Sequence, residues 1–250
     1  MKKVLKEIKL LNRSIPGLVF SMLIISIVLM NILANKSIDL HSNYIALDCG
    51  IVFSWIVFME MDLTVKRFGL KAANYLTIIS LIINLFISLL LLIVSFIPGF
   101  WSMADGENAG IINVSLNLTF RNTWYVLLGS SIAFLVSGIV NNVINYLIGK
   151  RTDKKNNFGG FIIRSYISTF IGQFVDNFIF ALLVSMPFFE WNIIQCITCA
   201  LTGAVFELLF EVIFSPIGYR IIKKWEKENV GSLYLDYIKD EENESTNNRN

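Results

Sequence analysis

Acidic and amide side chains inside long apolar segments are the residues of this sequence that could bind a solute or a proton. Asp176 is the deepest of these acids, because about 1.5 Å of rise per helical residue puts it about 18 Å beyond Arg164. Gln173 lies about one turn earlier on nearly the same face, and Asn177 adjoins Asp176. A carboxylate in the middle of a bilayer costs about 2.5–3.5 kcal/mol. It either hydrogen-bonds a neighbouring helix or contacts a substrate or proton, and we favour the second interpretation.

Further polar residues repeat at the spacing of one helical turn. Glu207 lies roughly 22 Å from the outer end of its segment, and Glu211 follows on the same face. Two other segments carry paired amides at this spacing, Asn141 with Asn145 and Asn31 with Asn35. Together these groups predict a vertical series of polar side chains from four helices, which suits a small polar solute inside a bundle.

The chemistry of these side chains indicates one class of ligand. A carboxylate accepts two parallel N–H donors, as the edge of a guanine-like base presents them, and amides match its carbonyl and ring nitrogens. An anionic substrate is disfavoured because no Lys or Arg is expected deep in a span. The predicted substrate-binding residues are Asp176, Gln173, Glu207, Asn141, Asn177 and Asn35.

Composition shows what must position these residues. Apolar residues make up 55% of the 250 positions and charged residues 16%, against about 25% charged in a soluble domain, and the mean hydropathy is +0.63. Residues 16–35 and 72–97 contain no charge, and each can cross about 30 Å of hydrocarbon as a helix. The alternation of a membrane barrel is absent. The sequence therefore predicts an all-α polytopic membrane protein.

Basic residues in the connections alternate along the chain and predict both termini in the cytoplasm. The expected domains are an interfacial segment at 1–15, a six-helix transmembrane domain at 16–222, and a polar tail at 223–250 that looks disordered from residue 229. The six predicted spans are Pro16–Asn35, Tyr44–Asp62, Ala72–Ile97, Asn122–Ile148, Arg164–Pro187 and Trp191–Tyr219.

Other charges fall at the ends of these spans. Glu60, Asp62 and Arg164 are expected at cytoplasmic ends, where water or lipid headgroups reach them. Asp48 lies near the outer end of its span, within reach of Lys36. A solvated or paired structural role is the expectation for all of them.

Several strings resemble the VUT family, the queuosine precursor transporters. They are Asn31-Ile-Leu-Ala-Asn-Lys36, Arg164-Ser-Tyr-Ile-Ser168, Gly172-Gln-Phe-Val-Asp-Asn-Phe-Ile-Phe180 and Glu211-Val-Ile-Phe-Ser-Pro216. The resemblance covers roughly residues 25–225. It implies six helices, import of deazaguanine precursors, no ATPase of its own, and a fold similar to the substrate-binding subunits of energy-coupling-factor vitamin transporters.

The sequence departs from the family pattern at two positions. Lys66 stands where an acid is expected, and Glu207 where a Lys is expected. These look like a swapped charge pair, which predicts that Lys66 and Glu207 approach each other at the cytoplasmic side. The residues expected to carry structural or gating charges are Arg164, Glu211, Lys66, Asp62, Lys36 and Asp48.

The leading interpretation is a secondary or facilitated importer of a queuosine precursor or related neutral or cationic base, in a bacterial cytoplasmic membrane. The alternative is a binding subunit that needs a separate ATPase module. The sequence leaves two further properties open: whether the protein forms a homo-oligomer, and whether transport is coupled to protons through Asp176 or Glu207. No GxxxxGK[ST] loop is present. An enzyme is disfavoured because the one histidine, His41, falls in a short outer connection and no nucleophile–base pair or HExxH motif is evident. Cys196-x-x-Cys199 is too weak to predict a metal site. We expect no cofactor and no nucleic-acid partner.

Overall fold

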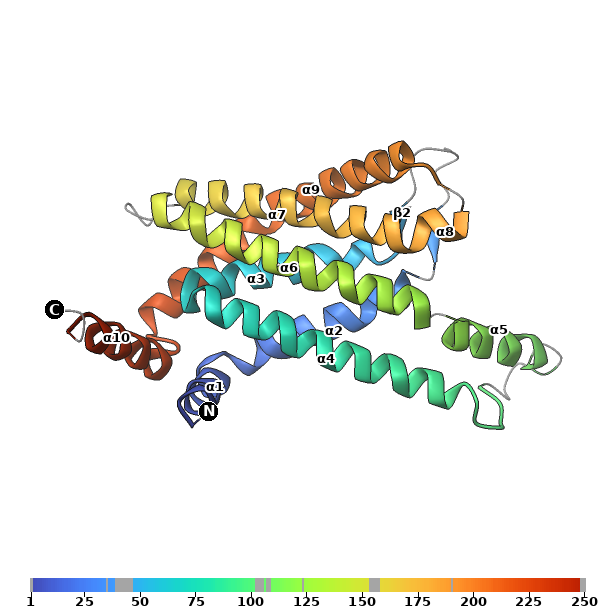
Figure 1. Ribbon diagram of the computed structural model, residues 1–250, viewed down its shortest axis with the longest axis horizontal. Helices are drawn as coiled ribbons and strands as arrows, with labels where there is room; N and C mark the ends of the chain where they lie inside the picture. Colours follow the sequence, from blue (N-terminus) through green and yellow to red (C-terminus); the bar gives the residue numbers. More distant parts are fainter. Residues whose placement is uncertain are drawn as a thin grey trace.

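The computed structural model describes residues 2–34, 36–38, 47–101, 106, 109–122, 124–152, 158–189 and 191–247. Long helices run roughly along one axis (Figure 1): α2 (Gly17–Leu33), α3 (Ile51–Phe68), α4 (Leu70–Val94), α6 (Trp124–Thr152), α7 (Phe158–Phe180) and α9 (Ile193–Lys227). The shorter elements are α1 (Lys2–Ser14), α5 (Ala109–Asn122), the π-helical turn η3 (Ala181–Ser185), α8 (Met186–Phe189), α10 (Ser232–Asn247), and the antiparallel strands β1 (Ser37–Ile38) and β2 (Leu47–Asp48).

Helix length and apolarity are those of a multi-pass membrane protein. Within the described ranges, four helical stretches are long and apolar enough to span a bilayer: Leu70–Val94, Trp124–Arg151, Phe158–Ser185 and Ile193–Lys227. A fifth is α2, if it counts together with α1, from which it turns by 95°. Helix α3 ends in a charged stretch that includes Glu60, Asp62, Lys66 and Arg67. The all-α polytopic class is confirmed, whereas six spans and cytoplasmic termini stay predictions.

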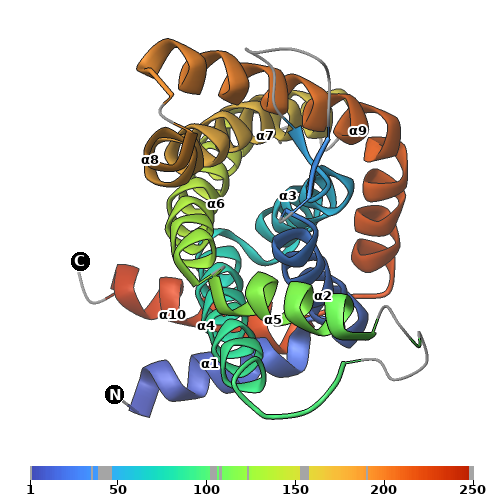
Figure 2. The ribbon, with the colours of Figure 1, turned by 90° about the vertical axis from the view of Figure 1, so that its right-hand side faces the viewer.

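The long helices form a bundle around α3. Helix α6 packs along α7, α7 along α9, and α3 contacts α2, α4, α6, α7 and α9; the end-on view shows this enclosure (Figure 2). Small residues allow the close approaches. A Cβ added at Gly172 of α7 would lie 2.8 Å from the Phe58 ring, and one at Gly203 of α9 would lie 2.6 Å from Asn177.

Side-chain burial follows the membrane pattern of an apolar exterior and a partly polar interior. Large apolar side chains such as Ile213, Ile82 and Leu18 are exposed, whereas Asn141, Gln173 and Glu211 are completely buried. A bilayer is the solvent that accounts for this distribution, because it accepts apolar surface and forces polar groups inward.

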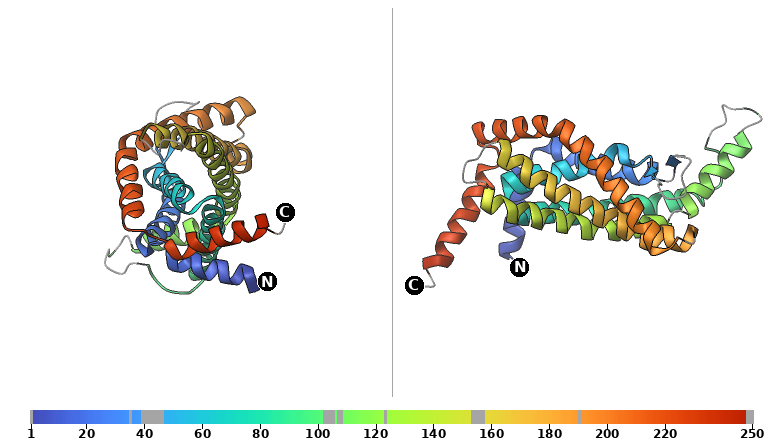
Figure 3. Two further views of the ribbon diagram at one scale, coloured as in Figure 1. Left: turned by 90° about the vertical axis from the view of Figure 1, so that its left-hand side faces the viewer. Right: turned by 90° about the horizontal axis from the view of Figure 1, so that it is seen from above.

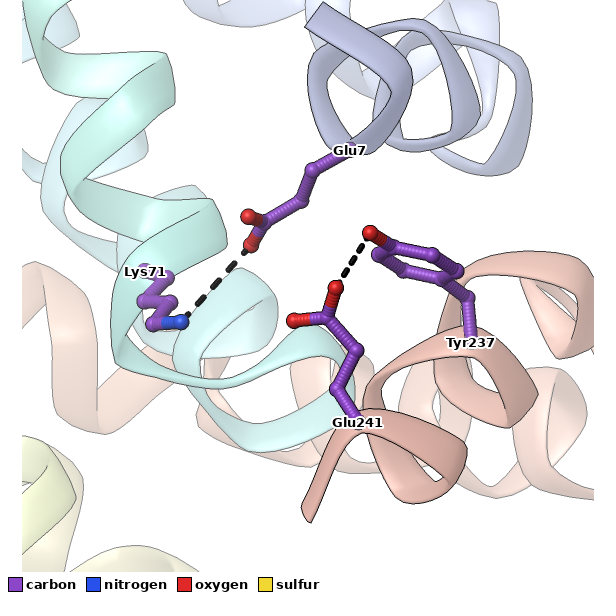
Figure 4. Close-up of polar contacts among 4 residues, drawn as sticks. All are labelled: Glu7, Lys71, Tyr237 and Glu241. Atoms are coloured by element: carbon purple, nitrogen blue, oxygen red, sulfur yellow. Dashed lines mark hydrogen bonds and ion pairs between the residues drawn. The ribbon is translucent and has the colours of Figure 1, made fainter. Parts of the chain in front are cut away.

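The N-terminal helix α1 and the C-terminal helix α10 lie at one end of the bundle, opposite α5 (Figure 3). Helices α1 and α10 pack together, with Tyr234 buried and Lys6 4.9 Å from the centre of the Tyr237 ring. Glu7 Oε1 of α1 lies 3.9 Å from Lys71 Nζ of α4, and Tyr237 donates a hydrogen bond to Glu241 (Figure 4).

The expectation of a disordered tail is wrong for Ser232–Asn247, which is helical. The physical reason lies in its apolar positions, because Tyr234, Leu235 and Ile238 join the core cluster that includes Leu11 of α1 and Trp225 of α9. An acidic composition therefore concealed an amphipathic helix. Residues 248–250 lie outside the described residues.

Candidate functional site

Polar side chains line one face each of α6 and α7. On α6 they recur every four residues, and on α7 every three or four, so that the two stripes face each other along the antiparallel pair. The members are Ser137, Asn141 and Asn145 on α6, and Ser165, Ser168, Thr169, Gln173 and Asp176 on α7.

Asp62 of α3 is the centre of a buried cluster nearer the α1–α10 end. Its side chain is 1% exposed. Asn141 Nδ2 donates to Asp62 Oδ1 at 2.9 Å, and Ser165 Oγ is hydrogen-bonded to Asp62 Oδ2. The hydroxyls of Ser168 and Thr169 lie 3.4 Å from the same carboxylate. Side chains of two helices, α6 and α7, thus converge on one acid of α3.

Glu211 of α9 joins this cluster through the same serine. The Ser165 hydroxyl lies 2.6 Å from Glu211 Oε1, and the glutamate is completely buried. Among the described residues, Glu211 Oε2 has no hydrogen-bond partner. We call Asp62, Ser165 and Glu211 the carboxylate cluster.

Arg164 supplies a buried positive charge beside this cluster. Its Nε donates to Asn145 Oδ1 at 2.8 Å, and Asn145 Nδ2 donates to Ser168 Oγ at 3.1 Å. A Cβ at Gly149 would lie 2.7 Å from Arg164 Nη1, so the absence of a side chain there makes room for the guanidinium.

The burial of these charges corrects the expectation that water or headgroups reach them. Asp62, Glu60 and Arg164 are 1%, 6% and 3% exposed. The reason is that α3 extends to Phe68 and α7 begins at Phe158, so each residue lies inside its helix rather than at its end. Arg164, six residues into α7, is thus a buried base inside the bundle.

A second layer lies farther along the bundle. Ser137 Oγ donates to Asp176 Oδ1 at 2.6 Å, and Ser54 Oγ donates to Glu207 Oε1 at 2.8 Å. Helices α3 and α7 run antiparallel, so the contact of Phe58 with Gly172 puts Ser54 and Asp176 at a similar height. We call Ser54, Ser137, Gln173, Asp176 and Glu207 the Gln173 layer.

Gln173 is the least satisfied polar residue of this layer. It is completely buried, and neither its Oε1 nor its Nε2 has a hydrogen-bond partner within the described part of the chain. A buried unsatisfied polar group costs about 1–3 kcal/mol. Two such atoms on one amide, on the α7 face that carries Asp176, indicate a place where a polar solute or water completes the hydrogen bonding.

The remaining predicted substrate residues, Asn141, Asn177 and Asn35, do not all join the Gln173 layer. Asn141 belongs to the Asp62 side, although its Oδ1 is buried without a partner among the described residues. Asn177 Nδ2 faces Gly203 of α9. Asn35 lies outside the described residues.

The predicted pairing of Lys66 with Glu207 is wrong. Glu207 is hydrogen-bonded to Ser54, and Lys66 lies twelve residues farther along α3, about 18 Å along the helix axis. The apparent charge swap is therefore a coincidence of sequence. At the outer connection, the Lys36 carbonyl accepts a hydrogen bond from the Cys49 amide at 2.8 Å, which brings the backbones at Lys36 and Asp48 together. Their ion pair stays a prediction.

Sequence reasoning missed the hydroxyl residues of both layers, namely Ser54, Ser137, Ser165 and Ser168. The available signal was spacing, because Ser165 and Ser168 share a helix face with Gln173 and Asp176. In the described ranges, no group of three or more His, Cys, Asp or Glu side chains could hold a metal, and the side chains of Cys196 and Cys199 are buried.

The fold and these layers define a class: a multi-pass helical membrane protein that keeps carboxylates and amides inside its bundle and away from lipid. The sequence profile of the family described as "putative vitamin uptake transporter" matches residues 48–221, and the chain belongs to this family. The match spans both layers. No curated protein and no solved structure matches the chain. A membrane transporter role follows from the family and the fold.

Proposed function

We propose that this protein imports a 7-deazaguanine precursor of queuosine, or a related purine-like base, across a bacterial cytoplasmic membrane without chemical change to the solute. Transport is secondary or facilitated. The observation that carries the proposal is the completely buried amide of Gln173 with neither polar atom partnered among the described residues.

The Gln173 layer matches the hydrogen-bonding edge of such a base. The Gln173 amide offers one acceptor and one donor group side by side, which complements a ring N–H next to a carbonyl. Asp176 and Glu207 offer carboxylates that accept paired N–H donors. Each currently bonds a serine hydroxyl, Ser137 and Ser54 respectively, and a solute with paired donors can replace or supplement these contacts.

The charge distribution favours a neutral or cationic solute over an anionic one. Arg164 bonds Asn145 near the carboxylate cluster, and it lies nine residues from Gln173, about 14 Å along α7. The Gln173 layer itself contributes two acids. An anion would therefore meet carboxylates before it met the guanidinium.

Uptake in a strain that cannot make the precursor tests the proposal. With wild-type protein, supplied precursor should restore queuosine to the tRNA. Gln173→Ala should reduce initial uptake at least about tenfold, corresponding to about 1.4 kcal/mol of lost interaction. Ile167→Ala is the matched control, because Ile167 lies on α7 and is 45% exposed.

Two results of this assay would contradict the proposal, and each contradicts a different part of it. If wild-type protein present in the membrane restores no queuosine from any deazaguanine precursor, the substrate class is wrong. If uptake occurs only when an ATPase module is co-expressed and co-purifies, the protein is a binding subunit rather than an independent importer.

A further inference from the structure

One hydroxyl lies between two buried carboxyl groups in the carboxylate cluster. Ser165 Oγ is within hydrogen-bond distance of Asp62 Oδ2 and of Glu211 Oε1. A serine hydroxyl carries one proton and can donate to one acceptor at a time. If both carboxyl groups were ionised, one contact would set an oxygen lone pair against a carboxylate. The geometry therefore requires a second proton in the cluster.

We propose that Glu211 holds this proton, and that Asp62, Ser165 and Glu211 form a proton-binding site that couples solute transport to proton movement. The coupling rests on the proposed transport function, whereas the site itself does not. In the occupied state, Glu211 Oε1–H donates to Ser165 Oγ, and the Ser165 hydroxyl donates to Asp62 Oδ2. Each oxygen on this path then has its donor.

The neighbours of the two acids indicate which one is neutral. Asp62 accepts a hydrogen bond from Asn141 Nδ2, and the hydroxyls of Ser168 and Thr169 lie near it. An ionised carboxylate, which can only accept hydrogen bonds, requires such donors. A chain of hydrogen bonds connects Arg164 to Asp62: Arg164 donates to Asn145, Asn145 donates to Ser168, and the Ser168 hydroxyl lies 3.4 Å from the Asp62 carboxylate. Glu211 Oε2, by contrast, is buried and has no partner among the described residues. An uncompensated charge at such a place is costly, so Glu211 is the acid that carries the proton.

The other charged groups around the cluster agree with this assignment. Helix α3 contributes Glu60, buried two residues before Asp62, and Lys66, half-buried one turn beyond it. Helix α7 contributes Arg164, and α6 contributes the neutral amides Asn141 and Asn145. With Glu211 neutral, the two acids of α3, Asp62 and Glu60, are matched by two bases, Arg164 and Lys66.

The short separations identify the ligand as a proton rather than a metal cation. The 2.6 Å between Ser165 Oγ and Glu211 Oε1 is an O–H···O distance. A cation bound at about 2.0–2.6 Å from each oxygen would hold the two oxygens farther apart.

Proton release gives the cluster two states. When the Glu211 O–H bond breaks and the proton passes to water, two anions on α3 and α9 share one hydroxyl on α7 and repel each other. Separation of α9 from α3 would then open this end of the bundle. Ser165 lies eight residues from Gln173 on α7, about 12 Å away, so one helix connects the proton site to the solute layer.

Infrared spectroscopy of the purified full-length protein tests the proton directly and needs no substrate. At neutral pH we expect the C=O band of a protonated carboxyl that is lost in Glu211→Gln. Glu60→Gln is the matched control, since Glu60 is the other buried acid at this end of α3, and it should leave the Glu211 band in place. If no protonated-carboxyl band distinguishes wild type from Glu211→Gln, the proposal is overturned.

Proteoliposomes test the coupling with a radiolabelled 7-deazaguanine base as the probe. An inward proton gradient should drive accumulation by wild-type protein, and Glu211→Gln should abolish that accumulation. Accumulation that follows a sodium gradient, or that ignores the pH gradient while wild-type counterflow persists, overturns the coupling but leaves the proposed function intact. Absence of wild-type counterflow contradicts the proposed function, and the infrared result then still decides the proton site.

Discussion

Two buried polar regions of this bundle differ in how completely their hydrogen bonds are satisfied. Toward the α5 end, Asn31 of α2 donates to Asn84 of α4 at 3.2 Å and to the Ile27 carbonyl. Asn84 in turn donates to Ser131 of α6 at 3.3 Å, and Ser130 donates to Asn31. We call these four polar residues the Asn31 layer; among the described side chains, its amide atoms all have partners.

The carboxylate cluster has the opposite character. It contains ionisable groups, and two buried atoms, Glu211 Oε2 in the cluster and Asn141 Oδ1 beside it, lack partners within the described ranges. Satisfied neutral amides between helices are structural, whereas charged groups with spare hydrogen-bonding capacity are suited to a ligand. The comparison shows that burial alone does not separate polar groups with complete hydrogen bonding from those with spare hydrogen-bonding capacity.

The largest effect is expected at Asp62. Asp62→Asn removes the anion that Ser165 and Asn141 surround and should lower uptake at least about tenfold, or about 1.4 kcal/mol in the transport barrier. Initial uptake at matched protein abundance measures this. Asp236→Asn, on the exposed face of α10, is the control. Wild-type uptake by Asp62→Asn would remove the functional distinction between the two regions.

A packing effect of intermediate size is expected between the two regions. Gly172→Ala places a Cβ 2.8 Å from the Phe58 ring and 2.9 Å from the Asn141 side chain. Such overpacking costs about 1–3 kcal/mol and should lower the thermal unfolding temperature in detergent. Gly17→Ala is the control, because a Cβ at Gly17 meets nothing within 4 Å. Equal unfolding temperatures for both variants would show that α7 can shift away from α3.

A smaller effect is expected in the Asn31 layer. Asn84→Ala should reduce the free energy of unfolding by about 0.6–1.7 kcal/mol, the range measured for hydrogen bonds between membrane helices. Uptake per folded molecule should stay unchanged, since this layer has no spare hydrogen-bonding capacity for a solute. Uptake at matched abundance checks this, and a loss as large as that of Asp62→Asn would give the Asn31 layer a transport role.

The smallest effect on stability near neutral pH is expected outside both regions, where α1 and α10 pack together. Burial, together with the nearby Glu7 and Glu241, raises the pKa of Tyr234 from 10.0 to about 12. Because the neutral form is favoured in the folded protein, its contribution to stability is complete below about pH 10 and is lost as the pH rises through about 12.

Tyrosinate absorbance measures this shift. The difference between wild type and Tyr234→Phe should show a midpoint near pH 12. A midpoint near 10 would mean that α10 does not bury Tyr234 against the bundle.

Part of the candidate site could be predicted from residue spacing. The shared face of Gln173 and Asp176 follows from the period of one helix, and the structure keeps both in one layer. The burial of Asp62 could not be predicted, because a charge near Lys66 and Arg67 resembles an ordinary span end. Only the contacts of α3 with α6, α7 and α9 show that its side chain is enclosed.

The amino-acid sequence alone indicates that this protein lies in a lipid bilayer. Scarce charge and long apolar segments require a bilayer, and a bilayer requires helices whose backbone hydrogen bonds are internal. The tertiary structure alone decided which polar residues meet, because partners such as Ser165 and Glu211 are 46 positions apart in the chain. Helical periodicity gives the face of each side chain, but the rotation and height of one helix against another depend on packing.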